Sequence, residues 1–194
     1  QMNKAEQLFD EMIKLNIKPD IITYTTLLNG YISIRNFEKA NQVLSKMIQE
    51  KMVNVVTCNS VIKFWCEEGN MIKAENILED MIKNNLTPDI VTFNTLIDGY
   101  LKNKEFEKAE KTFLKMINEF KIKPNVTTFN SIIDGYCKSN QIQTAEEWFQ
   151  KMQQFNIEPN VTTFTALING YFKNKDFEKA EKTFLKMINE FKIK

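Results

Sequence analysis

The chain has 194 residues, of which 43% are hydrophobic and 26% charged, a globular composition that excludes intrinsic disorder. Its formal net charge of +1 offers no bulk attraction for nucleic acid or acidic lipid, so such binding must come from local arrangement. Because the chain has no histidine, His-dependent catalytic triads and zinc-finger pairs are excluded. No apolar stretch approaches the ~18 residues that a membrane span needs, so we expect no membrane partner.

Three cysteines cannot all pair, and these lie in apolar helical patterns rather than at metal-ligand spacings. We expect Cys58, Cys66 and Cys137 to be buried thiols, and we predict no metal or other cofactor. The chain opens with Gln1 in mid-pattern and stops at Lys194 just short of a repeated turn. We therefore interpret it as a fragment that does not include a targeting segment.

A unit of about 35 residues recurs along the chain, as the four prolines and four of the five glycines indicate. Each proline lies in a motif such as Ile122-Lys123-Pro124-Asn125, and each of these glycines precedes a tyrosine, as in Gly135-Tyr136. One junction, at Val53-Asn54, lacks the proline. We predict the second half of a unit at 1–20 and further units at 21–54, 55–89, 90–125, 126–160 and 161–194, the last truncated at its end. Position 20 of a unit is always alanine: Ala5, Ala40, Ala74, Ala109, Ala145 and Ala180.

Two apolar stripes of helical period lie in each unit and predict two helices joined by a polar break. In unit 126–160 the first stripe contains Phe129, Ile132, Ile133 and Tyr136, and the second contains Ala145, Trp148, Phe149 and Met152. Helices of about 12–14 residues are marginal alone, so each must pack on its partner and on the next unit. The predicted fold is all-α, an α-solenoid of stacked antiparallel helical hairpins that form a superhelix.

The units lack the Trp-x-x-Leu-Gly opening of a tetratricopeptide repeat, which is the nearest competitor. Unit 90–125 instead reads Ile90-Val-Thr-Phe-Asn-Thr-Leu-Ile-Asp-Gly-Tyr100, then Phe106-Glu-Lys-Ala-Glu110 and Ile122-Lys-Pro-Asn125. This sequence resembles the P-type repeats of the pentatricopeptide repeat (PPR) family over essentially the whole chain. The resemblance implies a non-enzymatic superhelix that binds single-stranded RNA at one base per repeat, in mitochondria or another organelle.

Positions 2, 5, 9 and 13 of each first helix form one stripe, which we expect to line the open side of the stack. Position 5 is always Asn or Thr, and position 35 is always Asp or Asn, residues that also serve as ordinary helix N-caps. The resemblance implies that these two positions read bases, with the residues Thr25, Asn54, Asn59, Asp89, Asn94, Asn125, Asn130, Asn160 and Thr165.

Base preference follows from hydrogen-bonding capacity. An ionised Asp only accepts and suits uracil or guanine, whereas Asn can donate and suits cytosine or adenine. At position 5, Asn reaches a small pyrimidine and Thr leaves room for a purine. With the polarity that the resemblance implies, the expected core site is 5′-AUYYR-3′.

Two further positions of the stripe complete the expected site. Position 2 would pack against base faces, through Ile22, Val56, Val91, Thr127 and Thr162, the two threonines departing from the usual aliphatic residue. Position 13 would contact phosphates through Lys102, Lys138 and Lys173, but Ser33 and Glu67 occupy it in earlier units, so this cationic track is incomplete.

Two other functions stay open at this point. A protein-interaction or scaffold solenoid is favoured by the near-neutral charge and by the concave surfaces that helical repeats offer. An enzyme is the third candidate, because some PPR proteins carry a C-terminal zinc deaminase, but its His-Glu and Cys-x-x-Cys signatures are absent.

Overall fold

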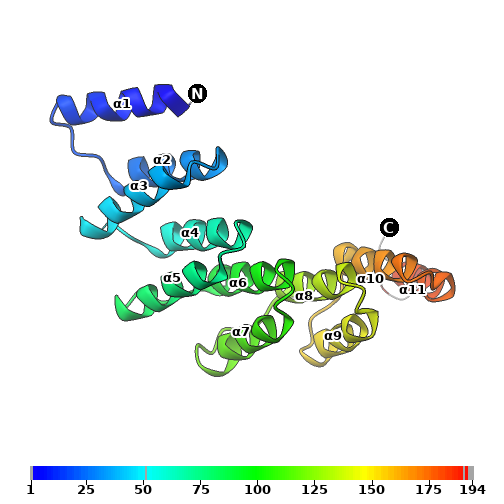
Figure 1. Cartoon of the computed structure of the whole chain (residues 1–194). Coiled ribbons are helices and arrows are strands. Elements are labelled where there is room, and N and C mark those ends of the chain that lie inside the picture. The colour runs from blue at the N-terminus through cyan, green and yellow to red at the C-terminus, as the bar shows by residue number, and fades with distance from the viewer. Residues whose placement is uncertain (1, 51, 190, 192–194) are drawn as a thin grey trace.

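The computed structural model describes residues 2–50, 52–189 and 191. Across them run α1 (Met2–Lys14), α2 (Ile21–Ser33), α3 (Phe37–Gln49), α4 (Val55–Glu67), α5 (Met71–Lys83), α6 (Ile90–Lys102), α7 (Phe106–Asn118), α8 (Val126–Lys138), α9 (Ile142–Gln154), α10 (Val161–Lys173) and α11 (Phe177–Asn189). The helices follow one another as an elongated array from the N-terminus to the C-terminus (Figure 1). No helix of the described ranges has the length and apolarity to cross a bilayer.

The start of each first helix is fixed by the Asp or Asn that precedes it. That side chain accepts a hydrogen bond from the backbone N–H of a threonine three residues on, at Asp20, Asn54, Asp89, Asn125 and Asn160. In α4, α6, α8 and α10 the hydroxyl oxygen of that threonine also accepts a hydrogen bond from the backbone N–H of the capping residue. The two bonds together form a capping box. The helices therefore begin where the repeat pattern places them.

The first helices form one layer, in which α4, α6, α8 and α10 each contact the next. Each also packs on its own second helix, through the pairs α4–α5, α6–α7, α8–α9 and α10–α11. The buried core lies between these two layers and contains Cys58, Cys66 and Cys137 as free thiols. The predicted α-solenoid of helical hairpins is confirmed.

A glycine at position 10 lets neighbouring first helices approach closely. A Cβ on Gly135 of α8 would lie 2.8 Å from the Cβ of Leu101 on α6, well inside van der Waals contact. In the same way, a Cβ on Gly99 would lie 2.7 Å from the Cβ of Cys66, and one on Gly170 would lie 3.0 Å from the Cβ of Cys137. The side chain at position 12 of one unit thus fills the space left by the glycine of the next.

A tyrosine at position 11 links units 126–160 and 161–194 to the unit before each of them. The Oη of Tyr136 donates to Oε1 of Glu110 at 2.6 Å, and Tyr171 donates to Glu146 at the same distance. Burial, followed by the hydrogen bond to Glu110, raises the pKa of Tyr136. These bonds join a first helix to the preceding second helix, so they fix the spacing between units.

Candidate nucleic-acid interface

The stripe residues of adjacent units face a common hollow. A cavity of about 480 Å³ is lined by residues of α6, α8 and α10 and the cap before α10, among them Asp98, Thr127, Asn130, Asp134, Asn160 and Thr162. Three consecutive first helices thus bring positions 2, 5, 9 and 35 together on one face, as the sequence pattern predicts.

Positions 5 and 35 of a unit are joined by a direct hydrogen bond in two of the units. The Nδ2 of Asn59 donates to Oδ1 of Asp89 at 3.0 Å, and the Nδ2 of Asn130 donates to Oδ1 of Asn160 at 3.1 Å. Each bond runs from the middle of a first helix to the N-cap of the next first helix. The two residues expected to read one base are therefore held side by side before any ligand is present.

Helix capping decides which atoms of position 35 are left for a ligand. Oδ1 of Asp89 accepts from the backbone N–H of Thr92 at 2.9 Å and from Asn59, so Oδ2 is the atom left to accept. In Asn160 the capping atom must also be the amide oxygen, because a backbone N–H needs an acceptor. The amide nitrogen of Asn160 is then left to donate.

Unit 21–54 differs in detail. It is one residue shorter than its neighbours, yet Asn54 still caps α4 and accepts from the backbone N–H of Thr57 at 2.9 Å. The hydroxyl of Thr25 donates to the carbonyl of Ile21 in its own helix at 2.6 Å rather than to Asn54. Asn94 and Asn125 lie at the corresponding places of unit 90–125, and Thr165 is exposed on α10.

Position 2 carries aliphatic side chains that are exposed. Ile22, Val56 and Val91 are 71%, 64% and 52% exposed, so the core does not explain them. Thr127 and Thr162 occupy the same position in α8 and α10 and are also exposed. This row of exposed side chains lies three residues before position 5 on each first helix.

Two of the three lysines at position 13 have a counter-ion within their own helix. Nζ of Lys102 lies 2.6 Å from Oδ2 of Asp98, and Nζ of Lys138 lies 2.6 Å from Oδ2 of Asp134. The hydrogen bond to Asp98 raises the pKa of Lys102 against the opposing effect of burial. The ammonium of Lys173 donates instead to the backbone carbonyl of Lys138. A phosphate would have to share two of the three lysines with an aspartate.

Comparison with known proteins decides the family. The profile of the pentatricopeptide repeat domain matches residues 7–64 and 76–139, that of the PPR repeat family matches 53–98 and 124–171, and that of the PPR repeat matches 155–188. The chain belongs to the pentatricopeptide repeat family.

Several curated relatives in this family come from Arabidopsis thaliana. A chloroplastic pentatricopeptide repeat-containing protein is 33% identical over 61% of this chain and 24% of its own length. A mitochondrial one is 32% identical over 60% of this chain and 18% of its own length. The chain thus spans about a quarter or less of the length of these relatives.

Solved PPR structures share the fold. Maize PPR10, in complex with an 18-nt psaJ RNA element, superposes with a TM-score of 0.82 at 23% identity over 96% of this chain and 27% of its own. The PPR domain of protein-only RNase P 1 from Arabidopsis thaliana, in complex with tRNA, gives a TM-score of 0.64 at 16% identity over 84% of this chain and 86% of that domain.

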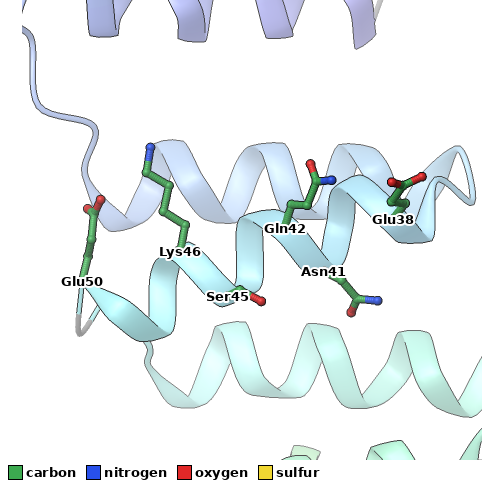
Figure 2. A pocket seen from close by; sticks show the side chains of 6 residues that line it. All are labelled: Glu38, Asn41, Gln42, Ser45, Lys46 and Glu50. Carbon is green, nitrogen blue, oxygen red and sulfur yellow. The ribbon is translucent and has the colours of Figure 1, made fainter.

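A second hollow of the PPR array, of about 590 Å³, lies away from the stripe. It is lined by Glu38, Asn41, Gln42, Ser45, Lys46 and Glu50, which project from α3 and the residue after it (Figure 2). No predicted reading, packing or phosphate residue lines it. Across the described ranges, no group of three or more Cys, Asp or Glu side chains could hold a metal ion.

Sequence reasoning missed the threonine at position 3 of each first helix. The hydroxyls of Thr92, Thr128 and Thr163 donate to Oδ1 of the position-5 asparagine of the preceding unit, at 2.6, 2.7 and 2.6 Å. All three threonines are fully buried. Their invariance within the chain, with Thr23 and Thr57 in the earlier units, is the signal that could have found them.

Proposed function

We propose that this PPR array binds single-stranded RNA along the stripe face, reads one base per unit and does not catalyse a reaction. The supporting observation is the pairing of Asn59 with Asp89 and of Asn130 with Asn160, in units whose residues at position 2 are exposed. Such a pair has two polar atoms left at fixed places, which is what recognition of a base edge requires. PPR10, a structural relative, was crystallised with RNA.

The core site proposed for the five units is 5′-AUYYR-3′. In unit 55–89, Oδ2 of Asp89 would accept from N3–H of uracil, and cytosine has no hydrogen there. In unit 126–160, Nδ2 of Asn160 would donate to N3 of cytosine. Because relatives are named as chloroplastic and mitochondrial, we place the whole protein in an organelle, where its role would be RNA processing, stability or translation.

A protein-interaction solenoid is the second candidate, and the ion pairs of the stripe favour it. Asp98 and Asp134 neutralise Lys102 and Lys138, so the face has little net attraction for a polyanion. A protein partner would not need that attraction. The two functions differ in whether base identity matters.

Replacing the carboxylate of Asp89 by an amide tests the proposal. Asp89→Asn keeps an N-cap and the shape of the side chain but replaces an acceptor by a donor. We expect the second base of the site to change from uracil to cytosine, by several-fold or more in relative affinity, since a matched base contact is worth roughly 1–3 kcal/mol in the DNA case. Fluorescence anisotropy with oligonucleotides that differ only at that base measures the change.

Asp176→Asn is the matched control. It removes the same charge at the start of a second helix, where Asp176 accepts from the backbone N–H of Lys179 at 3.0 Å, away from the stripe. The control should keep the preference for uracil. If Asp89→Asn binds RNA and still prefers uracil, base reading by this pair is wrong. If the unmodified chain binds no RNA, the protein-interaction function takes its place.

A further inference from the structure

A buried threonine hydroxyl is hydrogen-bonded to each asparagine at position 5. Thr92, Thr128 and Thr163 lie at position 3 of α6, α8 and α10, are fully buried, and donate to Oδ1 of Asn59, Asn94 and Asn130. We propose that these threonines are positioning residues that set the base selectivity of the preceding unit by fixing the orientation of its reading amide. This inference rests on the function proposed above.

The distances identify the atom that faces the hydroxyl. Separations of 2.6 and 2.7 Å are those of an O–H···O bond, whereas an N–H···O bond is usually about 2.9 Å. Asn59 and Asn130 supply an independent test of the orientation, because their Nδ2 atoms donate to cap oxygens already committed as acceptors. A reversed amide would set two acceptor oxygens against each other. The carbonyl therefore faces the threonine in each case.

The threonine performs two functions with one hydroxyl. In unit 126–160, Oγ1 of Thr128 accepts from the backbone N–H of Asn125 at 3.2 Å, which completes the capping box of α8. Oγ1 of Thr128 is closer to Oδ1 of Asn94, at 2.7 Å, than to Oδ1 of Asn125, at 3.1 Å, so its single proton goes to Asn94. The cap of one helix is thereby coupled to the reading side chain of the helix before it.

A fixed amide has a consequence for base choice. With its oxygen occupied by threonine, the asparagine offers only N–H donors to a ligand. Uracil and cytosine both carry an acceptor, O2, next to N3. Guanine carries an amino group, N2, at the corresponding place, and adenine only a C–H. The buried threonine therefore favours pyrimidines and disfavours guanine, in addition to any effect of side-chain length.

Asn94 depends most on its threonine. Asn59 and Asn130 are also tied to position 35, whereas the hydrogen bond found for the side chain of Asn94 among the described residues is the one from Thr128. Thr128→Val removes the hydroxyl and keeps the shape of the side chain. The amide of Asn94 can then turn its oxygen toward the ligand and accept from the amino group of guanine.

The chain provides a matched control in Thr57. It is also fully buried and completes the same capping box, with Asn54 at 2.9 Å. Its hydroxyl donates to Asn54 itself, while Thr25 bonds to the carbonyl of Ile21. Thr57→Val thus removes the hydroxyl that completes the capping box of α4, as Thr128→Val does for α8. It removes no hydrogen bond from a residue at position 5.

The experiment measures anisotropy-based affinities for RNAs that carry C, U, A or G at the third base, opposite unit 90–125, with the fourth base varied as an internal reference. In Thr128→Val we expect the preference for pyrimidine over guanine at the third base to fall about three- to tenfold, as for loss of one hydrogen bond. The preference at the fourth base, read by Asn130, should be unchanged. Thr128→Ser should restore selectivity, and Thr57→Val should leave it intact at the third base.

A second measurement does not involve RNA. In the free protein, ¹⁵N relaxation of the Asn94 side-chain amide, identified by its loss in Asn94→Ala, should report greater motion in Thr128→Val and normal order in Thr128→Ser. Equal order in Thr128→Val, or unchanged pyrimidine selectivity in a folded variant, overturns the positioning role and leaves the proposed function intact. A wild-type chain without base preference overturns base reading, and the selectivity role of Thr128 with it.

Discussion

Nδ2 of Asn59 donates to Oδ1 of Asp89 at 3.0 Å, although the two residues are 30 positions apart in the sequence. The bond joins the two positions that we propose to read one base, and it uses the same oxygen that caps α6. Recognition and helix capping are thus performed by one carboxylate. A change in the state of Asp89 should alter both RNA selectivity and the stability of the array.

The first prediction concerns pH. Desolvation alone would raise the pKa of Asp89, but hydrogen bonds from the backbone N–H of Thr92 and from Asn59 oppose it and hold the pKa below the ordinary 3.8. Because the folded pKa is depressed, these bonds stabilise the protein above the unfolded pKa and are lost only as pH falls through the folded value. Asp89 therefore stays an acceptor across neutral and mildly acidic pH.

We expect the preference for uracil over cytosine at the second base to be constant between about pH 5.5 and pH 8. Anisotropy titrations over this range, with Asp89→Asn as a variant that has no carboxylate to titrate, check the prediction. A preference that disappears with a midpoint above about pH 5.5 would show that another group reads this base.

The second prediction concerns position 5. In Asn59→Thr, the hydroxyl should bond back to its own helix, as the hydroxyl of Thr25 does to Ile21 at 2.6 Å. The shorter side chain withdraws its donor and leaves room for a purine, while Asp89 still requires an imino hydrogen. The second base should move from uracil toward guanine by several-fold. If a folded variant binds RNA and keeps its preference for uracil, the reading of one base per unit is wrong for this chain.

The third prediction concerns the ion pairs of the stripe. Replacing Asp98 and Asp134 together by Asn releases Lys102 and Lys138 for phosphate. The pairs are exposed and contribute at most about 1 kcal/mol each, so the melting temperature should change little. Affinity for all RNA sequences should rise, and the salt dependence should steepen by roughly 0.7 for each lysine that binds a phosphate.

Glu79→Gln is the control for this charge change. Glu79 pairs with Lys83 at 3.5 Å on α5, a second helix, with the same four-residue spacing. Glu79→Gln removes one negative charge and changes no residue of the stripe. If Glu79→Gln raises affinity per charge as much as the double variant does, the effect is one of net charge and the lysines of position 13 do not bind phosphate.

The fold could be predicted from the sequence because the repeat multiplies a weak local signal. A single Ala or Gly says little, but Ala at position 20 and Gly before Tyr recur in register, and each is buried or closely packed in the structure. The stripe could be predicted as well, because it depends only on helical period. Its exposed aliphatic residues, such as Ile22 and Val91, are where that pattern predicts them.

The partners within the stripe could not be predicted in the same way. The bond from Thr128 to Asn94 crosses 34 residues and depends on the offset between α6 and α8. Periodicity within one helix does not define that offset, which is set by close contacts such as that of Leu101 with Gly135. The pairing of Lys102 with Asp98 is local, and the four-residue spacing could have indicated it.

The last prediction tests that offset through two glycines with the same place in the repeat. Replacing a mid-helix Gly by Ala improves helix propensity by about 1 kcal/mol. In Gly30→Ala the new Cβ would meet Sδ and Cε of Met2 at 2.6 and 3.0 Å, the flexible end of a side chain that can rotate away. The improved propensity should prevail, so we expect Gly30→Ala to be at least as stable as the wild type.

Gly135→Ala should behave in the opposite way, because its new Cβ would lie 2.8 Å from the Cβ of Leu101, an atom fixed to the backbone of α6. Only a separation of α6 and α8 relieves that contact, and overpacking of this kind costs about 1–3 kcal/mol. Urea unfolding followed by circular dichroism should therefore rank Gly135→Ala below both the wild type and Gly30→Ala. The same separation pulls Thr128 away from Asn94, so selectivity at the third base should fall with stability in Gly135→Ala alone. Equal stability of the two variants would show that the first helices are not held in register by this contact.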